Sequence, residues 1–351
     1  MDFNSFDNFL LIPLPEKPGH AHLYELIPTG KFARSSFVLI PYHSPKEIVD
    51  PKFYFLKNKR EILLPSVKGN TASIQLTPLT PKKKYLNTLH KLKQHIQRGD
   101  IYEINYCIRF AAQGINIDPI HVFSKLDVLA KAPYSALLKI GNDFILCASP
   151  ELFLKKDGSV LSSKPIKGTI RRGKSKEEDT TLKEELYTNI KERTENVMAV
   201  DVARNDLSQL AVKGSVQVNK LYNIESFETV HQMVSTVSCE LKNGTSFEKI
   251  LDATFPMASM TGAPKLKARQ LIDLYEDFNR GYYSGAMGLI DENENFVISV
   301  IIRSIFYNQN SRELSIAVGG AITYLCDPER EYEECLLKAK ALLTALNATI
   351  S

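Results

Sequence analysis

The feature that most constrains the fold is a succession of short apolar segments separated by turn residues. Glycine, asparagine and aspartate stand between neighbouring segments, as at 141–143 and 157–158, and such residues favour tight hairpins. The succession therefore predicts many antiparallel strands. The segments expected to be strands are 101–110, 135–140, 144–148, 152–154, 160–162, 287–290, 296–306 and 313–323.

Longer segments carry apolar residues at helical spacing. From Lys82 to Ile96 these residues recur every three or four positions, and Gly99 ends the pattern. Many antiparallel strands with a few long helices indicate an α+β fold. The other expected helices are about 176–198, 246–254 with Thr245 and Glu248 as a capping box, one that begins at Pro264, and about 331–346.

The first 80 residues are rich in proline and less regular. Segments 36–40 and 53–56 are candidate strands, but the pattern does not place them in a topology. We expect residues 1–80 to form a short N-terminal region that contributes strands to the same fold.

Composition excludes several classes of protein. The 351 residues carry a net charge of only +4, and no aromatic residues interleave the densest basic run, 82–84, which argues against nucleic-acid binding. No run of about 18 apolar residues predicts a membrane span. The five cysteines form no C-x-x-C pattern, and the first residues lack a basic stretch, so we expect a cytoplasmic protein with free thiols.

Two expected helices each carry a pair of glutamates three positions apart. The pairs are Glu192 with Glu195 and Glu331 with Glu334. This spacing places both carboxylates of a pair on one helical face. Four oxygen donors on facing helices would suit Mg2+, whereas each pair taken alone is equally explained as solvated surface.

Lys167 lies in the stretch 165–169, where small and apolar residues surround it. A buried lysine has a lowered pKa and can act as a nucleophile. The glycine that follows would let the backbone approach a ligand. The alternative is a surface lysine in a turn.

Other candidate binding residues occur in loops and strands. The loop 261–265 precedes a helix and could hold an anion, or it could be an ordinary helix entry. Gly319 and Gly320 interrupt a strand, which indicates a bulge or a ligand against the backbone. Arg303 stands in an apolar stretch and needs an anionic partner, which could be a ligand or another side chain.

The order of these segments resembles that of the chorismate-utilising enzymes. The resemblance covers about residues 82–347. It implies two large antiparallel sheets packed as a sandwich with flanking helices, an active site in the cleft between them, and a catalytic domain at 82–351. The matching segments are 99–105, 149–151, 195–207, 261–265, 283–288 and 331–339.

The resemblance also implies an activity. Lysine in the P-I-K-G-T stretch is typical of aminodeoxychorismate synthases, while anthranilate synthases usually have alanine there. Lys167 would attack C2 of chorismate and expel the C4 hydroxyl, and ammonia would then displace the lysine. The product would be 4-amino-4-deoxychorismate, the precursor of p-aminobenzoate in folate biosynthesis. No glutaminase pattern is evident, so ammonia would come from a separate glutamine amidotransferase subunit.

The family likeness assigns roles to the remaining candidates. Glu151 would be the general acid, His231 would lie over the leaving hydroxyl, and Mg2+ would bind the four glutamates. The residues expected to bind the substrate are Thr261, Gly262, Tyr283, Arg303, Gly319, Gly320 and Lys338.

One residue departs from the family pattern. Glu103 stands where related aminating enzymes usually have glutamine and isochorismate-forming enzymes have a lysine base. Anthranilate synthase, isochorismate synthase and an inactive scaffold that binds an amidotransferase remain as alternatives.

Overall fold

The computed structural model describes residues 3–42, 50–66, 73–228 and 230–351, and these residues form a mixed α+β fold. The α-helices are α1 Lys82–Gln97, α2 Pro119–Ala130, α3 Lys176–Thr188, α4 Ile190–Ser208, α5 Phe247–Thr254, α6 Lys265–Tyr275 and α7 Pro328–Leu346, with short 3-10 helices η1 Phe3–Ser5 and η2 Ala258–Met260.

The strands account for most of the remaining order. They are β1 Asn8–Pro13, β2 His20–Pro28, β3 Ser36–Ile40, β4 Lys52–Leu63, β5 Ile74–Pro78, β6 Glu103–Ala112, β7 Tyr134–Ile140, β8 Asp143–Ser149, β9 Leu152–Asp157, β10 Val160–Ser163, β11 Ile166–Arg171, β12 Gln217–Ser226, β13 Val230–Glu240, β14 Gly262–Ala263, β15 Ala286–Ile290, β16 Phe296–Val300, β17 Ser304–Asn308, β18 Glu313–Ile322 and β19 Ala348–Ile350.

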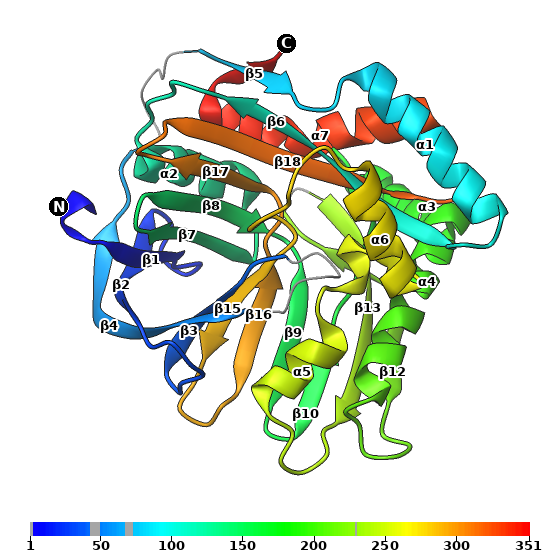
Figure 1. The fold of residues 1–351 in the computed structure, drawn as a ribbon, viewed down its shortest axis with the longest axis horizontal. Coiled ribbons are helices and arrows are strands. Elements are labelled where there is room, and N and C mark those ends of the chain that lie inside the picture. The colour runs from blue at the N-terminus through cyan, green and yellow to red at the C-terminus, as the bar shows by residue number, and fades with distance from the viewer. Residues whose placement is uncertain (1–2, 43–49, 67–72, 229) are drawn as a thin grey trace.

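The antiparallel strands form two groups, which we call the upper and lower limbs of the sheet (Figure 1). The upper limb runs β5, β6, β18, β17, β8 and β7, and the lower limb runs β3, β15, β16, β9, β10 and β13, with β11 and β12 also paired to β13. Strands β1, β2 and β4 connect the limbs, since β1 pairs with β7 and β4 pairs with β3. The two expected sheets are thus joined by the N-terminal strands.

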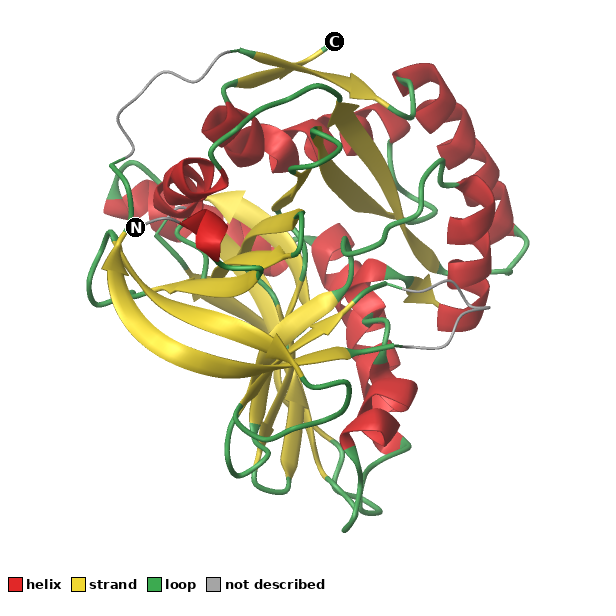
Figure 2. Cartoon of the chain, turned by 60° about the vertical axis from the view of Figure 1, so that its left-hand side comes forward, coloured by secondary structure: helices red, strands yellow, loops and turns green. Residues whose placement is uncertain are grey.

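Apolar packing holds the limbs and helices together. Leu39 of β3, Leu138 of β7 and Met287 of β15 belong to one buried cluster, so side chains of both limbs meet there. A larger cluster packs α1, α2 and α7 against the upper limb, and Figure 2 shows helices along the top and right of the sheet. This layering confirms the expected α+β class.

Two predicted elements are interrupted in the structure. The helix expected at 176–198 is two helices, because Asn189 is extended and its side chain accepts a hydrogen bond from the Glu192 amide to begin α4. The strand expected at 296–306 breaks before β17, where Arg303 has a φ of 52°. Helix α5 is capped by Ser246 and not by Thr245.

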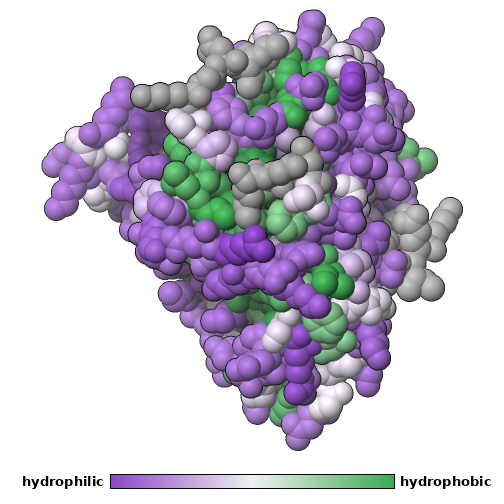
Figure 3. Space-filling model, turned by 90° about the vertical axis from the view of Figure 1, so that its left-hand side faces the viewer, coloured by the Kyte–Doolittle hydropathy of each residue, from purple (hydrophilic) through white to green (hydrophobic). Residues whose placement is uncertain are grey.

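The described helices include none that is long and apolar enough to cross a bilayer. The face that Figure 3 shows is mainly hydrophilic, with its hydrophobic side chains in separate patches.

A fully buried arginine, Arg280, ties three parts of the fold together. Its guanidinium forms a bidentate pair with Glu276 at 2.6 and 2.8 Å. It also donates to the carbonyls of Met260 in η2 and Asn105 in β6. Glu276 in turn accepts from the Cys107 amide of β6, so this pair fixes the end of α6 against the upper limb.

We expect Glu276→Gln to lower the free energy of unfolding by about 3–5 kcal/mol, because it leaves a buried guanidinium without its counter-charge. Urea denaturation measures the change. Glu185→Gln on the exposed face of α3 is the control and should shift stability by less than about 0.5 kcal/mol. A loss below about 1 kcal/mol for Glu276→Gln would contradict the structural role of the pair.

Candidate active site

Lys167 lies on β11 with its side chain buried at 8% exposure. Strand β11 pairs with β13, and the register shifts between Ile166 and Thr169, so Lys167 sits at a bulge. Gly168 has a φ of +87°, and a β-carbon there would lie 3.0 Å from the Glu192 carboxylate. The glycine therefore lets the start of α4 pack directly against the bulge.

Glu103, the first residue of β6, forms an ion pair with the Lys167 amine. Its side chain is also buried. The neighbouring loop is fixed by Gly262 of β14, whose φ is +144° and whose β-carbon would lie 2.2 Å from the Glu103 carbonyl. The predicted anion loop 261–265 thus serves here to pack β14 against the strand that carries Glu103.

The expected lowering of the Lys167 pKa is wrong for the structure as it stands. Burial acts to lower this pKa, but the carboxylates of Glu103, Glu195 and Glu151 outweigh it and raise the pKa above the ordinary lysine value. The amine is therefore charged in this structure, because it is buried together with several carboxylates.

Glu151 lies between β8 and β9, close to the same amine. Burial raises its pKa to about 7, against the opposing effects of a hydrogen bond with Ser259 and the charge of Lys167. The backbone amide of Ile166, the residue before Lys167, also donates to it. A carboxyl group with a pKa near neutrality can carry a proton to a leaving group.

The four predicted metal-binding glutamates lie near the beginnings of α4 and α7. Burial raises the pKa of Glu195 to about 8 and raises those of Glu192 and Glu331. Burial also acts to raise the pKa of Glu334, but the hydrogen bond and charge of Lys338 together with the charges of Lys191 and Lys167 outweigh it and lower this pKa. Burial thus disfavours the charged form of three of these carboxylates, and a cation bound there would favour it.

Lys191 supplies positive charge to this group of glutamates. Its amine is 2.8 Å from Glu331 and 3.8 Å from Glu195, so it lies between the two helices. Among the described residues, no three acidic, histidine or cysteine side chains converge closely enough to hold a metal ion. The donor chemistry nevertheless fits Mg2+, since one Glu195 oxygen is buried without a hydrogen-bond partner.

A pocket beside this acidic group holds two of the predicted substrate ligands, Arg303 and Lys338. Pro150 and Thr169 line the same pocket, which places it next to Glu151 and Lys167. Burial lowers the pKa of Arg303, and no described residue forms an ion pair with its guanidinium. The pocket therefore offers an unneutralised cation to an anionic ligand.

The other residues predicted to bind the substrate make contacts within the protein. The Gly319 carbonyl accepts a hydrogen bond from the Lys338 amine at 2.9 Å. A β-carbon at Gly320 would lie 3.1 Å from a carboxylate oxygen of Glu331. The Thr261 hydroxyl is bonded to the Met257 carbonyl within its own turn. Tyr283 is buried, and burial raises its pKa well above the usual value.

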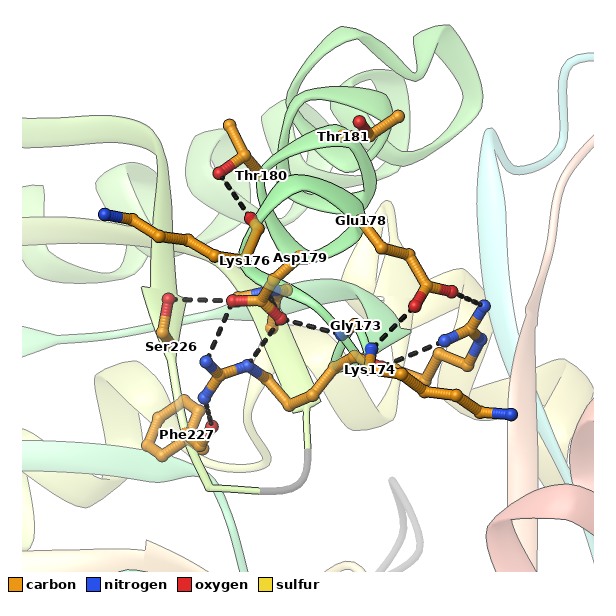
Figure 4. Close-up of polar contacts among 12 residues, drawn as sticks. Gly173, Lys174, Lys176, Glu178, Asp179, Thr180, Thr181, Ser226 and Phe227 are labelled. Atoms are coloured by element: carbon orange, nitrogen blue, oxygen red, sulfur yellow. Dashed lines mark hydrogen bonds and ion pairs between the residues drawn. The ribbon is translucent and has the colours of Figure 1, made fainter.

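His231 is not brought into this pocket. Its ring nitrogens lie 2.9 Å from the Ser226 hydroxyl and 3.0 Å from Asp179 of α3. Asp179 also accepts from Arg172 and from the Gly173 amide, and this cluster fixes the start of α3 (Figure 4). The histidine thus stabilises the α3 contact, as an ordinary buried histidine does.

Gln232, which sequence reasoning missed, faces the pocket instead. Successive side chains of a strand point to opposite faces, so the neighbour of His231 on β13 lies on the Thr169 side. Its amide nitrogen is 3.5 Å from the Thr169 hydroxyl, and its buried oxygen has no hydrogen-bond partner. That oxygen can accept a hydrogen bond from a bound ligand.

Comparison with known proteins decides the family. A family model described as chorismate binding enzyme matches residues 53–344. The chain belongs to the chorismate binding enzymes. It is 38% identical to aminodeoxychorismate synthase of Arabidopsis thaliana over 286 residues, which cover 81% of this chain and 31% of that protein.

Relatives with another activity are similar too. Anthranilate synthase component 1 of Haloarcula marismortui is 34% identical over 77% of this chain and 54% of its own length. The chain thus spans about a third to a half of these two chorismate binding enzymes. Anthranilate synthase component I of Streptococcus pneumoniae has the same fold, with a TM-score of 0.74 at 22% identity over 92% of this chain and 80% of that one.

Arg303→Gln should weaken the binding of chorismate about 10- to 100-fold, because a charged hydrogen bond to a carboxylate contributes about 1.5–3 kcal/mol. Titration calorimetry measures the affinity. Arg303→Lys retains the charge and should lose less, and Arg60→Gln on an exposed strand face should lose nothing. Unchanged binding by Arg303→Gln would exclude this guanidinium as a substrate ligand.

Proposed function

We propose that this chain is the aminating component of an aminodeoxychorismate synthase, which converts chorismate and ammonia to 4-amino-4-deoxychorismate. The observation that carries the proposal is the buried amine of Lys167 next to Glu151, a carboxyl group with a pKa of about 7. Aminodeoxychorismate synthases and anthranilate synthases have similar sequence identity to this chain. The chemistry around Lys167 therefore separates these two activities better than overall sequence identity does.

The reaction consists of two displacements. Neutral Lys167 attacks C2 of the ring, the conjugated double bonds shift, and the C4–O bond breaks while Glu151 donates a proton to the leaving oxygen. Ammonia then attacks C4 and the lysine leaves C2. Nitrogen takes the place of the hydroxyl with retained geometry, because each displacement transfers the substitution between C2 and C4.

The pocket residues orient the ring for these steps. Arg303 and Lys338 supply positive charge for the substrate carboxylates, and the unpartnered oxygen of Gln232 can accept from the C4 hydroxyl. Mg2+ held by Glu192, Glu195, Glu331 and Glu334 would bind a substrate carboxylate and balance the acidic group. With the metal bound, the Lys191 amine would leave its place between Glu331 and Glu195.

The supply of ammonia and the compartment are part of the same proposal. A separate glutamine amidotransferase subunit would release ammonia. This chain would use that ammonia to aminate chorismate. The five cysteines are buried and unpaired, which supports the reducing cytoplasm expected from sequence.

Chorismate incubated with the wild-type protein, Mg2+ and ammonium should yield 4-amino-4-deoxychorismate, identified by chromatography and mass spectrometry. Lys167→Ala should lose at least about 100-fold of this activity because no other described residue places an amine there. Without ammonia, intact mass should show an adduct on Lys167 in the wild type. The formation of anthranilate or isochorismate by the wild type would reject the proposal.

Mg2+ should bind the protein with heat measurable by titration calorimetry in the absence of substrate. Glu195→Gln and Glu331→Gln should each weaken this binding at least tenfold, because each removes a charged donor from a small set. Glu185→Gln is the control. Removal of the metal with a chelator should abolish amination, and full activity in chelator would contradict the role of the metal.

A further inference from the structure

The ion pair between Lys167 and Glu103 gives the amine a proton acceptor inside the protein. The two side chains belong to β11 and β6, and both are buried, at 8% and 4% exposure. Among the described residues, Glu103 is the carboxylate within ion-pair distance of this amine. Glu151 and Glu195 influence it from further away.

A charged lysine has no lone pair for attack, so it must first lose a proton. Release of that proton to water would leave Glu103 as an uncompensated buried anion, which is costly. Transfer of the proton along the existing hydrogen bond leaves an amine and a carboxylic acid, both neutral. The buried pair therefore favours internal transfer over release to solvent.

We propose that Glu103 is the base that takes the proton from Lys167 and makes it a nucleophile. This inference rests on the proposed function. The Nζ–H bond breaks and an O–H bond forms on Glu103. The amine electron pair then forms the bond to C2, the C4–O bond breaks, and the proton of Glu151 completes a water molecule.

The protons balance over the second displacement. Ammonia bonds to C4 and its excess proton passes to the Glu151 carboxylate, which restores the acid. The C2–N bond breaks, and its electrons return to the lysine nitrogen. Lys167 then recovers its proton from Glu103, so the pair is again charged and the site is ready for another substrate.

Glutamine at 103 could hold the amine by a hydrogen bond but could not accept its proton. We therefore predict that Glu103→Gln forms the Lys167 adduct about 100-fold more slowly at pH 6. Its rate should rise about tenfold per pH unit between pH 5 and 6, because the proton must go to solvent. The wild-type rate should be flat in this range, where Glu151 stays largely protonated.

Single-turnover adduct formation without ammonia, followed by intact mass, gives this profile. The other charged groups that face Lys167 are Glu151, Glu195, Glu192 and Glu334, and they are the same in both proteins. Glu103→Asp should recover a flat profile at a reduced rate. Asp206→Asn breaks another buried pair, with Lys265 at 2.5 Å, and should leave the profile flat.

Each outcome separates the two proposals. A wild type that forms no adduct would reject the proposed function. A wild type that forms the adduct, with Glu103→Gln equally fast or uniformly slow with a flat profile, would overturn the role of Glu103 alone. A uniform loss in both Glu103→Gln and Glu103→Asp, with no change in the pH slope, would assign Glu103 a positioning role only.

Discussion

The contact between Lys167 and Glu103 joins the two limbs of the sheet at the point where chemistry is expected. Glu103 begins a strand of the upper limb, and Lys167 lies on a strand that pairs with the lower limb. Taking both charges out of water is costly, and their attraction offsets this cost only in part. The surrounding fold must therefore hold the pair in place, and it does so through the bulge at Gly168 and the close packing of Gly262 against β6.

The buried carboxylates near this pair differ in what they can do. Glu151 has a pKa near neutrality because it is buried with few donors, so it can carry a proton. Glu195 has a higher pKa and one oxygen without a partner, which suits a cation ligand. The proposed roles in acid catalysis, base catalysis and metal binding thus fall to different carboxylates of one acidic region, because each has different neighbours.

Local pattern predicted the hairpins and most helices, since their apolar spacing and turn residues are local signals. It missed the break at Asn189 because Leu186 and Ile190 keep helical spacing across it, although asparagine with a glutamate three positions later is a favoured start of a helix. The N-terminal strands could not be placed because their partners lie far along the chain. Likewise, Glu103 and Lys167 are 64 positions apart. The choice between His231 and Gln232 depends on which face of β13 lies against Thr169, and that pairing is a long-range contact.

The glycine after Lys167 limits how this scaffold can be redesigned. A β-carbon at residue 168 would lie 3.0 Å from one side-chain atom of Glu192 and 3.1 Å from one of Leu186, and the φ of +87° strains any residue other than glycine. Libraries that vary the side chain at 167 would have to vary residue 103 with it, because a residue without positive charge at 167 leaves Glu103 as a buried anion without its partner.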